Sequence, residues 1–174
     1  MYRMFIAVGL LCTGLAAADG STVWRLYAFS KLPKEVALFY LESEVVRTPG
    51  DVQVWTKALD AAKVEADNHG KKTAALSQTA ELLLKGYKPP LSTVTDLTSD
   101  QVMTVILFER VADQATVTPT VRILYDIDCA QKQFRMLSML MNNPTGRENQ
   151  PSPWQHVPPE SAIETLTKLV CRPT

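Results

Sequence analysis

Short alternating and β-branched stretches predict strands in the first third of the chain. Val23–Phe29 is rich in aromatic and β-branched residues, and Val36–Leu41 resumes this pattern after a proline. Val45–Arg47 and Val52–Lys57 flank Thr48–Asp51, in which Pro precedes Gly as in a tight turn. The pattern predicts two strands followed by a β-hairpin.

The middle of the chain has helical spacing instead. Leu59–Asp67 is rich in alanine and charge, and we predict a helix there that ends before Asn68. Thr73–Lys85 carries leucines at helical spacing, with Gly86 as a stop signal. The prolines that follow predict a loop through about Leu97.

The segment Ser99–Ala112 fits two structures. Thr98 and Gln101 have the spacing of a capping box, which predicts a helix. The run Val102–Phe108 alone is also compatible with a buried strand. The cap and the charged residues after the run favour the helix.

Strands return after Pro119. Val121–Cys129 alternates, a turn follows at Ala130–Lys132, and Gln133–Met141 runs back, with its leucines and methionines predicted as sheet core. Asn143–Pro153 is polar and predicts a long loop.

The chain then approaches a last helix. Trp154 begins a short extended piece that reaches Pro158-Pro159. Ser161 and Glu164 have capping-box spacing ahead of the apolar positions of Ala162–Val170, which predicts a terminal helix.

The N-terminus has the pattern of a secretory signal. Arg3 precedes an apolar run, Met4–Leu15, and small residues lead to a predicted cleavage after Ala18. The run is too short to span a membrane. Cys12 is not a predicted lipid site because Leu11, before it, is not small. We expect residues 1–18 to be removed and residues 19–174 to form one domain.

Cleavage changes both the charge and the cysteine count. The chain has 18 basic and 18 acidic residues, so loss of Arg3 leaves 17 against 18, a net charge of −1. This balance argues against nucleic-acid binding, which needs clustered cations.

Cys129 and Cys171 remain after cleavage, and two cysteines in an oxidising compartment pair by default. His69 and His156 lack zinc-site spacing, so no metal site is expected.

The order of these segments resembles the surface-adhesin protein E family of Gram-negative bacteria. The matching pieces are Phe39-Tyr40, Asp51–Lys57, Leu124–Cys129, Lys132–Ser138, Trp154–Ser161 and Val170-Cys171. They cover roughly 24–57 and 122–171. The resemblance implies an antiparallel sheet with a disulfide-tethered C-terminal helix, and a secreted or outer-surface protein. The best-known relative is a dimeric adhesin for host extracellular-matrix and plasma proteins that also binds haem. This chain adds a helical insertion at 59–113 and lacks a lipidation cysteine.

Few residues suggest reaction chemistry. No nucleophile–base–acid set is evident, so no catalytic residue and no cofactor are assigned. His156 is either a simple loop histidine or, through its imidazole, a haem ligand. Asp126 and Asp128 share one strand face and are expected to face solvent, with a cation or glycosidase pair as the alternative. The tryptophans, Trp24, Trp55 and Trp154, are expected to pack against the terminal helix.

The predicted fold is therefore α+β, a small antiparallel sheet with a disulfide-tethered C-terminal helix and a helical insertion in mid-chain. We expect an exported, non-enzymatic protein that binds a protein partner, with the sheet edges as one route to a partner or to a homodimer. The alternative is a periplasmic binding or envelope-maintenance domain. An enzyme is the third class.

Overall fold

A computed structural model describes residues 23–30, 35–70, 79–114, 116–141, 147–148 and 151–172. The predicted signal segment, 1–18, lies outside the described residues. In the described part no helix is long and apolar enough to cross a membrane.

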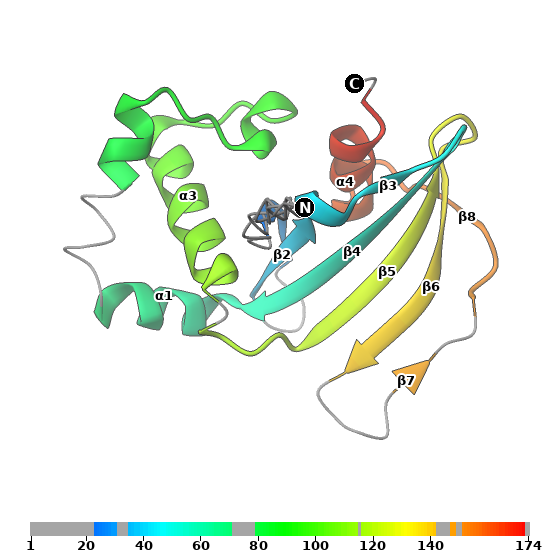
Figure 1. Ribbon diagram of the computed structural model, residues 1–174, viewed down its shortest axis with the longest axis horizontal. Helices are drawn as coiled ribbons and strands as arrows, with labels where there is room; N and C mark the ends of the chain where they lie inside the picture. The colour runs from blue at the N-terminus through cyan, green and yellow to red at the C-terminus, as the bar shows by residue number, and fades with distance from the viewer. Residues whose placement is uncertain are drawn as a thin grey trace, which may run out of the picture.

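The described strands form one antiparallel sheet, which confirms the predicted fold class. Its main path runs β1-β2-β4-β5-β6-β7, while β3 pairs with β4 and β8 pairs with β6 (Figure 1). The strands are β1 (Trp24–Ser30), β2 (Val36–Leu41), β3 (Val46–Arg47), β4 (Asp51–Asp60), β5 (Val121–Asp128), β6 (Gln133–Met141), β7 (Arg147–Glu148) and β8 (Gln155–His156).

Local signals explain the turns. Gly50 has φ of 98°, and Thr48 and Asp51 exchange backbone hydrogen bonds, which closes the predicted β3–β4 hairpin. Gly86, with φ of 76°, ends the helix that includes residues 79–84, because its N–H donates to Leu83 and the next N–H donates to Leu82. These stop and turn predictions are confirmed.

Besides the helix that includes residues 79–84, the described helices are α1 (Ala61–Gly70), α3 (Ser99–Asp113) and α4 (Ala162–Val170), with short 3-10 turns η1 (Glu42–Glu44) and η2 (Pro90–Thr93). Thr98 and Gln101 form the full capping box, so the helical interpretation of this segment is confirmed and the strand alternative is wrong. At α4, Ser161 accepts from the N–H of Glu164, but the Glu164 carboxylate accepts from the N–H of Glu160. Only half of that predicted capping box forms.

The strand–helix boundary after the hairpin differs from the prediction. β4 continues through Asp60, because its residues 56–60 pair with β2, and Asp60 then accepts a hydrogen bond from Lys63 N–H at the start of α1. α1 continues to Gly70 rather than ending before Asn68. Pairing with a neighbouring strand overrides the helical composition of Leu59 and Asp60.

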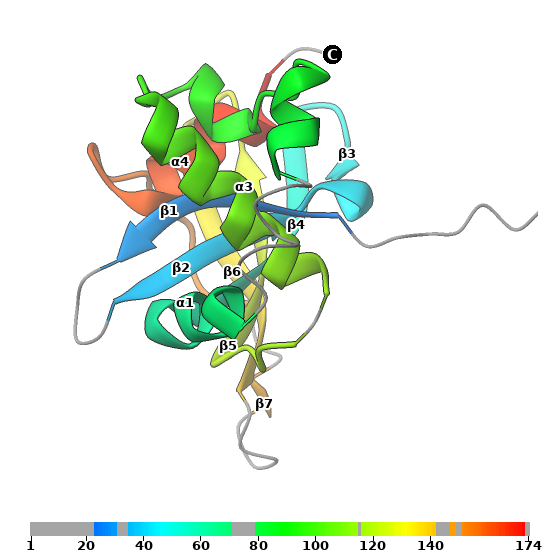
Figure 2. The same ribbon diagram turned by 90° about the vertical axis from the view of Figure 1, so that its left-hand side faces the viewer.

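Two buried clusters lie on opposite faces of the sheet. On one face, α1 and α3 pack on Leu26, Phe39 and Leu59; on the other, α4 packs on Tyr40 and Val54. Figure 2 shows β1 between α3 and α4. Alternation along β2 and β4 sends successive side chains into the two clusters.

The strand edges are more occupied than the sequence suggested. On β1, the N–H groups of Trp24 and Leu26 donate to the carboxylates of Asp113 and Glu109, two α3 residues one turn apart. On β6, β7 and β8 pair at the two ends, and Ser152 exchanges hydrogen bonds with the backbone of Met136 between them. Strand addition at these positions would displace existing hydrogen bonds.

β6 is also less buried than predicted. Its residues 133–140 are half-buried and Met141 is exposed, so the prediction that these leucines and methionines form sheet core is wrong. The physical reason is the position of β6 at the side of the sheet away from α3 (Figure 1), where Phe134 is the β6 residue that packs, partly buried, against the α4 cluster.

Candidate functional site

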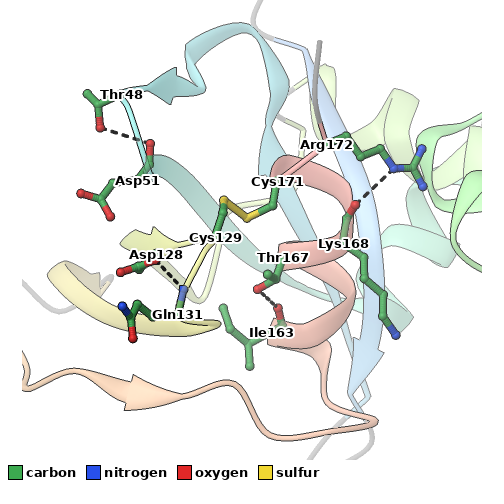
Figure 3. The surroundings of a disulfide bond; sticks show 10 residues. All are labelled: Thr48, Asp51, Asp128, Cys129, Gln131, Ile163, Thr167, Lys168, Cys171 and Arg172. Carbon is green, nitrogen blue, oxygen red and sulfur yellow. Dashed lines mark hydrogen bonds between the residues drawn. A yellow bond between two sulfur atoms is a disulfide. The ribbon is translucent and has the colours of Figure 1, made fainter.

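The predicted disulfide joins Cys129, just after β5, to Cys171, at the end of α4 (Figure 3). Local hydrogen bonds hold both ends: Cys129 N–H donates to Gly50 and Cys171 N–H donates to Thr167. Leu166 and Val170 bury the inner side of α4. The bridge therefore fastens the helix to the end of the sheet, as predicted, and is a structural element.

His156 lies in β8, paired with Gln133 of β6, and its side chain is exposed. The haem-ligand hypothesis stays a prediction. Among the described residues, no group of three or more histidine, cysteine, aspartate or glutamate side chains is placed to hold a metal ion.

Asp126 and Asp128 have different surroundings. Asp126 is only 3% exposed, so the prediction that it faces solvent is wrong, whereas Asp128 accepts a hydrogen bond from the N–H of Gln131 in the turn after β5. The cross-strand partner of Asp126 is Arg135, whose Nε and Nη2 donate to Asp126 Oδ2 at 2.9 and 2.7 Å. An ion pair with arginine makes burial of the carboxylate tolerable.

Arg135 also supports an exposed tryptophan. Its guanidinium carbon lies 4.4 Å from the ring centroid of Trp154, which is 39% exposed. Because Asp126 holds the guanidinium, the indole has a fixed cationic platform. Asp126, Arg135 and Trp154 form what we call the Arg–Trp patch.

The tryptophans do not pack against the terminal helix as predicted. Trp24 is buried in the cluster with α3, and Trp55 packs partly against that same cluster. Trp154 lies in the Arg–Trp patch. The reason is strand parity: Trp55 and Val54 are adjacent in β4, so only Val54 faces α4.

A cleft of about 310 Å³ opens beside Trp55 on the α3 side of the sheet, between β4, β5, β6 and the end of α3. Its apolar wall includes Leu41, Trp55 and Leu140. Its charged lining consists of Lys57, Arg122, Glu44 and Asp113. We call it the Lys57 cleft.

Lys57 is buried in this cleft, with 4% of its surface exposed. Its Nζ donates to the carbonyl of Ala112 at 2.8 Å and lies 4.1 Å from the ring centroid of Trp24. Burial lowers the pKa of Lys57 to about 8; Arg122 adds to the decrease and Asp113 opposes it. The ammonium is desolvated and is held by a carbonyl and a ring.

A third set of charges lies at the β1 edge. Glu109, 2% exposed, accepts hydrogen bonds from Leu26 N–H at 3.2 Å and from the Tyr87 hydroxyl at 2.8 Å, and it faces Arg25 at 3.4 Å. Burial raises the pKa of Glu109 to about 7, against the lowering effects of Tyr87, Arg25 and Leu26. Its partners are structural, since they join α3 to β1 and to the segment that follows Gly86.

The Arg–Trp patch and the Lys57 cleft were not assigned from the sequence. The sequence predicted that strand 121–129 is followed by a turn and strand 133–141. The pairing of Asp126 with Arg135 could have been inferred from that arrangement. Lys57 and Arg122 belong to strands far apart in sequence, and only the β4–β5 register places them opposite each other.

The family model described as Surface-adhesin protein E matches residues 91–172. No curated protein and no solved structure gives a match. The first part of the predicted resemblance, 24–57, lies outside the matched segment. The match confirms the resemblance of the chain to the surface-adhesin protein E family through the segment that holds β5, β6, α4 and both bridged cysteines.

Proposed function

We propose that this protein is an exported, non-enzymatic binding protein of the Gram-negative cell envelope that contacts an extracellular host protein through the Arg–Trp patch. The observation that carries the proposal is Trp154, exposed and stacked on an arginine whose position is set by a buried aspartate. Tryptophan and arginine are enriched among residues that dominate binding energy at protein interfaces.

The geometry supports the proposal because Asp126 holds the Arg135 guanidinium beneath Trp154 before any partner binds. The Arg135 guanidinium beneath Trp154 is already ordered in the free protein, so less conformational entropy is lost when a partner covers Trp154. The family match supports an adhesin-like role. The occupied strand edges favour binding through this surface rather than through strand addition.

Localisation is tested first, because only a surface protein can meet a host partner. Intact cells are treated with protease, and the loss of the native protein is compared with its loss after the outer membrane is permeabilised. Digestion on intact cells supports the proposal. Protection that ends on permeabilisation contradicts it and supports the alternative, a periplasmic binding or envelope-maintenance domain.

The surface itself is tested with the purified protein on immobilised extracellular-matrix extract. We expect Trp154→Ala to reduce binding by about tenfold or more, the loss typical of a residue that dominates an interface. Leu84→Ala is the matched control, because Leu84 is an exposed apolar residue outside the patch. Equal binding by both variants would contradict a role for the patch. Sedimentation velocity on the same samples tests the predicted homodimer.

A further inference from the structure

The Lys57 cleft contains an unfavourable arrangement of charge. Lys57 and Arg122 are direct cross-strand partners in β4 and β5, so two cations lie opposite each other on one face. Like charges in such positions destabilise a sheet. Among the described residues no carboxylate is in ion-pair contact with either cation.

The two acids of the cleft compensate these cations only in part. Asp113 Oδ1 accepts the N–H of Trp24 at 2.6 Å, which commits that oxygen to the β1 edge. Glu44 belongs to η1 and is exposed, where water screens its charge. Both cations line the cleft, and one of them is buried, so an anion inside the cleft would be attracted by both.

The apolar residues of the cleft indicate the chemistry of the uncharged part of a ligand. Leu41, Trp55 and Leu140 supply apolar surface, and the volume is that of a small-molecule site. The nearby Asp113 and Glu44 would repel a doubly charged phosphate more strongly than a monoanion. The best fit is one negative charge on an apolar body.

We propose that the Lys57 cleft binds a small organic carboxylate, with its carboxylate between Lys57 and Arg122 and its apolar or aromatic body against Trp55, Leu41 and Leu140. The contrasting interpretation is that Lys57 serves structure alone, by holding the end of α3 through Ala112. That interpretation predicts no carboxylate binding. The inference is independent of the Arg–Trp patch and of any protein partner.

The test uses 4-phenylbutyrate and its neutral amide as probes on the purified full-length mature protein. Binding is followed by the fluorescence of the tryptophans and by backbone amide NMR shifts. We expect the acid to bind with a Kd of about 1 mM or below, and at least about tenfold more tightly than the amide, because a hydrogen-bonded charge contributes more than a neutral group. No binding by the acid, or equal binding of acid and amide, would overturn the proposal.

Three variants locate the site. Lys57→Met keeps most of the unbranched side chain without its charge, and Arg122→Gln removes the exposed partner cation. Each substitution should weaken binding of the acid about tenfold or more. Lys63→Met, at an exposed position of α1, should leave it unchanged. If Lys57→Met fails to fold, Arg122→Gln decides alone, since its side chain is exposed. Unchanged affinity in Arg122→Gln would overturn the assignment.

A pH series adds an independent readout. The pKa of Lys57, lowered to about 8 by burial, implies that the ammonium loses its proton between pH 7 and 9. Affinity for the acid should decline across this range, while the amide shows no such decline. Failure of the cleft to bind 4-phenylbutyrate leaves the Trp154 test unaffected, so the two proposals fail separately.

Discussion

Glu109 of α3 accepts a hydrogen bond from the backbone N–H of Leu26 in the edge strand β1, at 3.2 Å. One turn later on the same helix, Asp113 accepts from Trp24 N–H at 2.6 Å. A helix thus satisfies alternate donors of a strand edge with two carboxylates. Because Glu109 is buried, this contact couples the stability of the fold to pH.

We expect the free energy of unfolding to fall between about pH 4.5 and 7 through Glu109. Its pKa is raised to about 7 by burial, so the folded state retains a proton that the unfolded state has lost, and stability falls as pH rises. Over this window the wild type should lose on the order of 2–3 kcal/mol relative to Glu109→Gln, whose side chain does not titrate. Urea unfolding at a series of pH values measures the difference.

The control for this prediction is Glu65→Gln, at an exposed position of α1. Arg25, Tyr87 and Asp113 also act on Glu109, and subtraction of the two curves removes the titration of groups that the proteins share. Parallel curves for wild type and Glu109→Gln would contradict the prediction.

Asp126 should matter more than Asp128, although the two residues are two positions apart on one strand. We expect Asp126→Asn to destabilise the protein by about 1–3 kcal/mol, because Arg135 loses its buried charged partner. Trp154 emission should also shift, since its platform is no longer held. Asp128→Asn retains an oxygen that can accept the N–H of Gln131, so it should change neither stability nor emission noticeably.

Loss of the disulfide should lower the unfolding free energy without undocking α4. The bridge joins residues 42 positions apart, which the chain-entropy model values at about 4 kcal/mol. Urea denaturation of Cys129→Ser/Cys171→Ser measures this loss. Helical circular dichroism should persist in water because Leu166 and Val170 remain buried. A helical signal weaker than that of the wild type under these conditions would show that the bridge is needed for α4 to dock.

The packing of α4 predicts a large contrast between two leucines. Leu166 is fully buried against the sheet, whereas Leu84 is 89% exposed. Leu166→Ala should cost about 2–5 kcal/mol through lost burial and a cavity, and Leu84→Ala should change stability by less than about 0.5 kcal/mol. Similar losses in both variants would contradict the assignment of α4 to the core.

Local signals were sufficient for most elements of the fold. The Pro-Gly turn, the capping box at Thr98 and the stop at Gly86 depend on residues within one turn of each other, and the structure has all three. The cysteine pair was predicted because two cysteines allow one intramolecular pairing. Errors occurred at Leu59 and Asp60, where β2 extends the strand by long-range pairing.

Local geometry and the number of cysteines were enough to predict most of the strands and helices, the turns and the disulfide. The surroundings of the charged and aromatic side chains depend instead on the tertiary fold. It buries Asp126 under Arg135, exposes Trp154 on that arginine, and brings Lys57 opposite Arg122. The physical reason is that strand register and helix placement bring together groups that are distant along the chain. Burial then sets their pKa values and their capacity to bind.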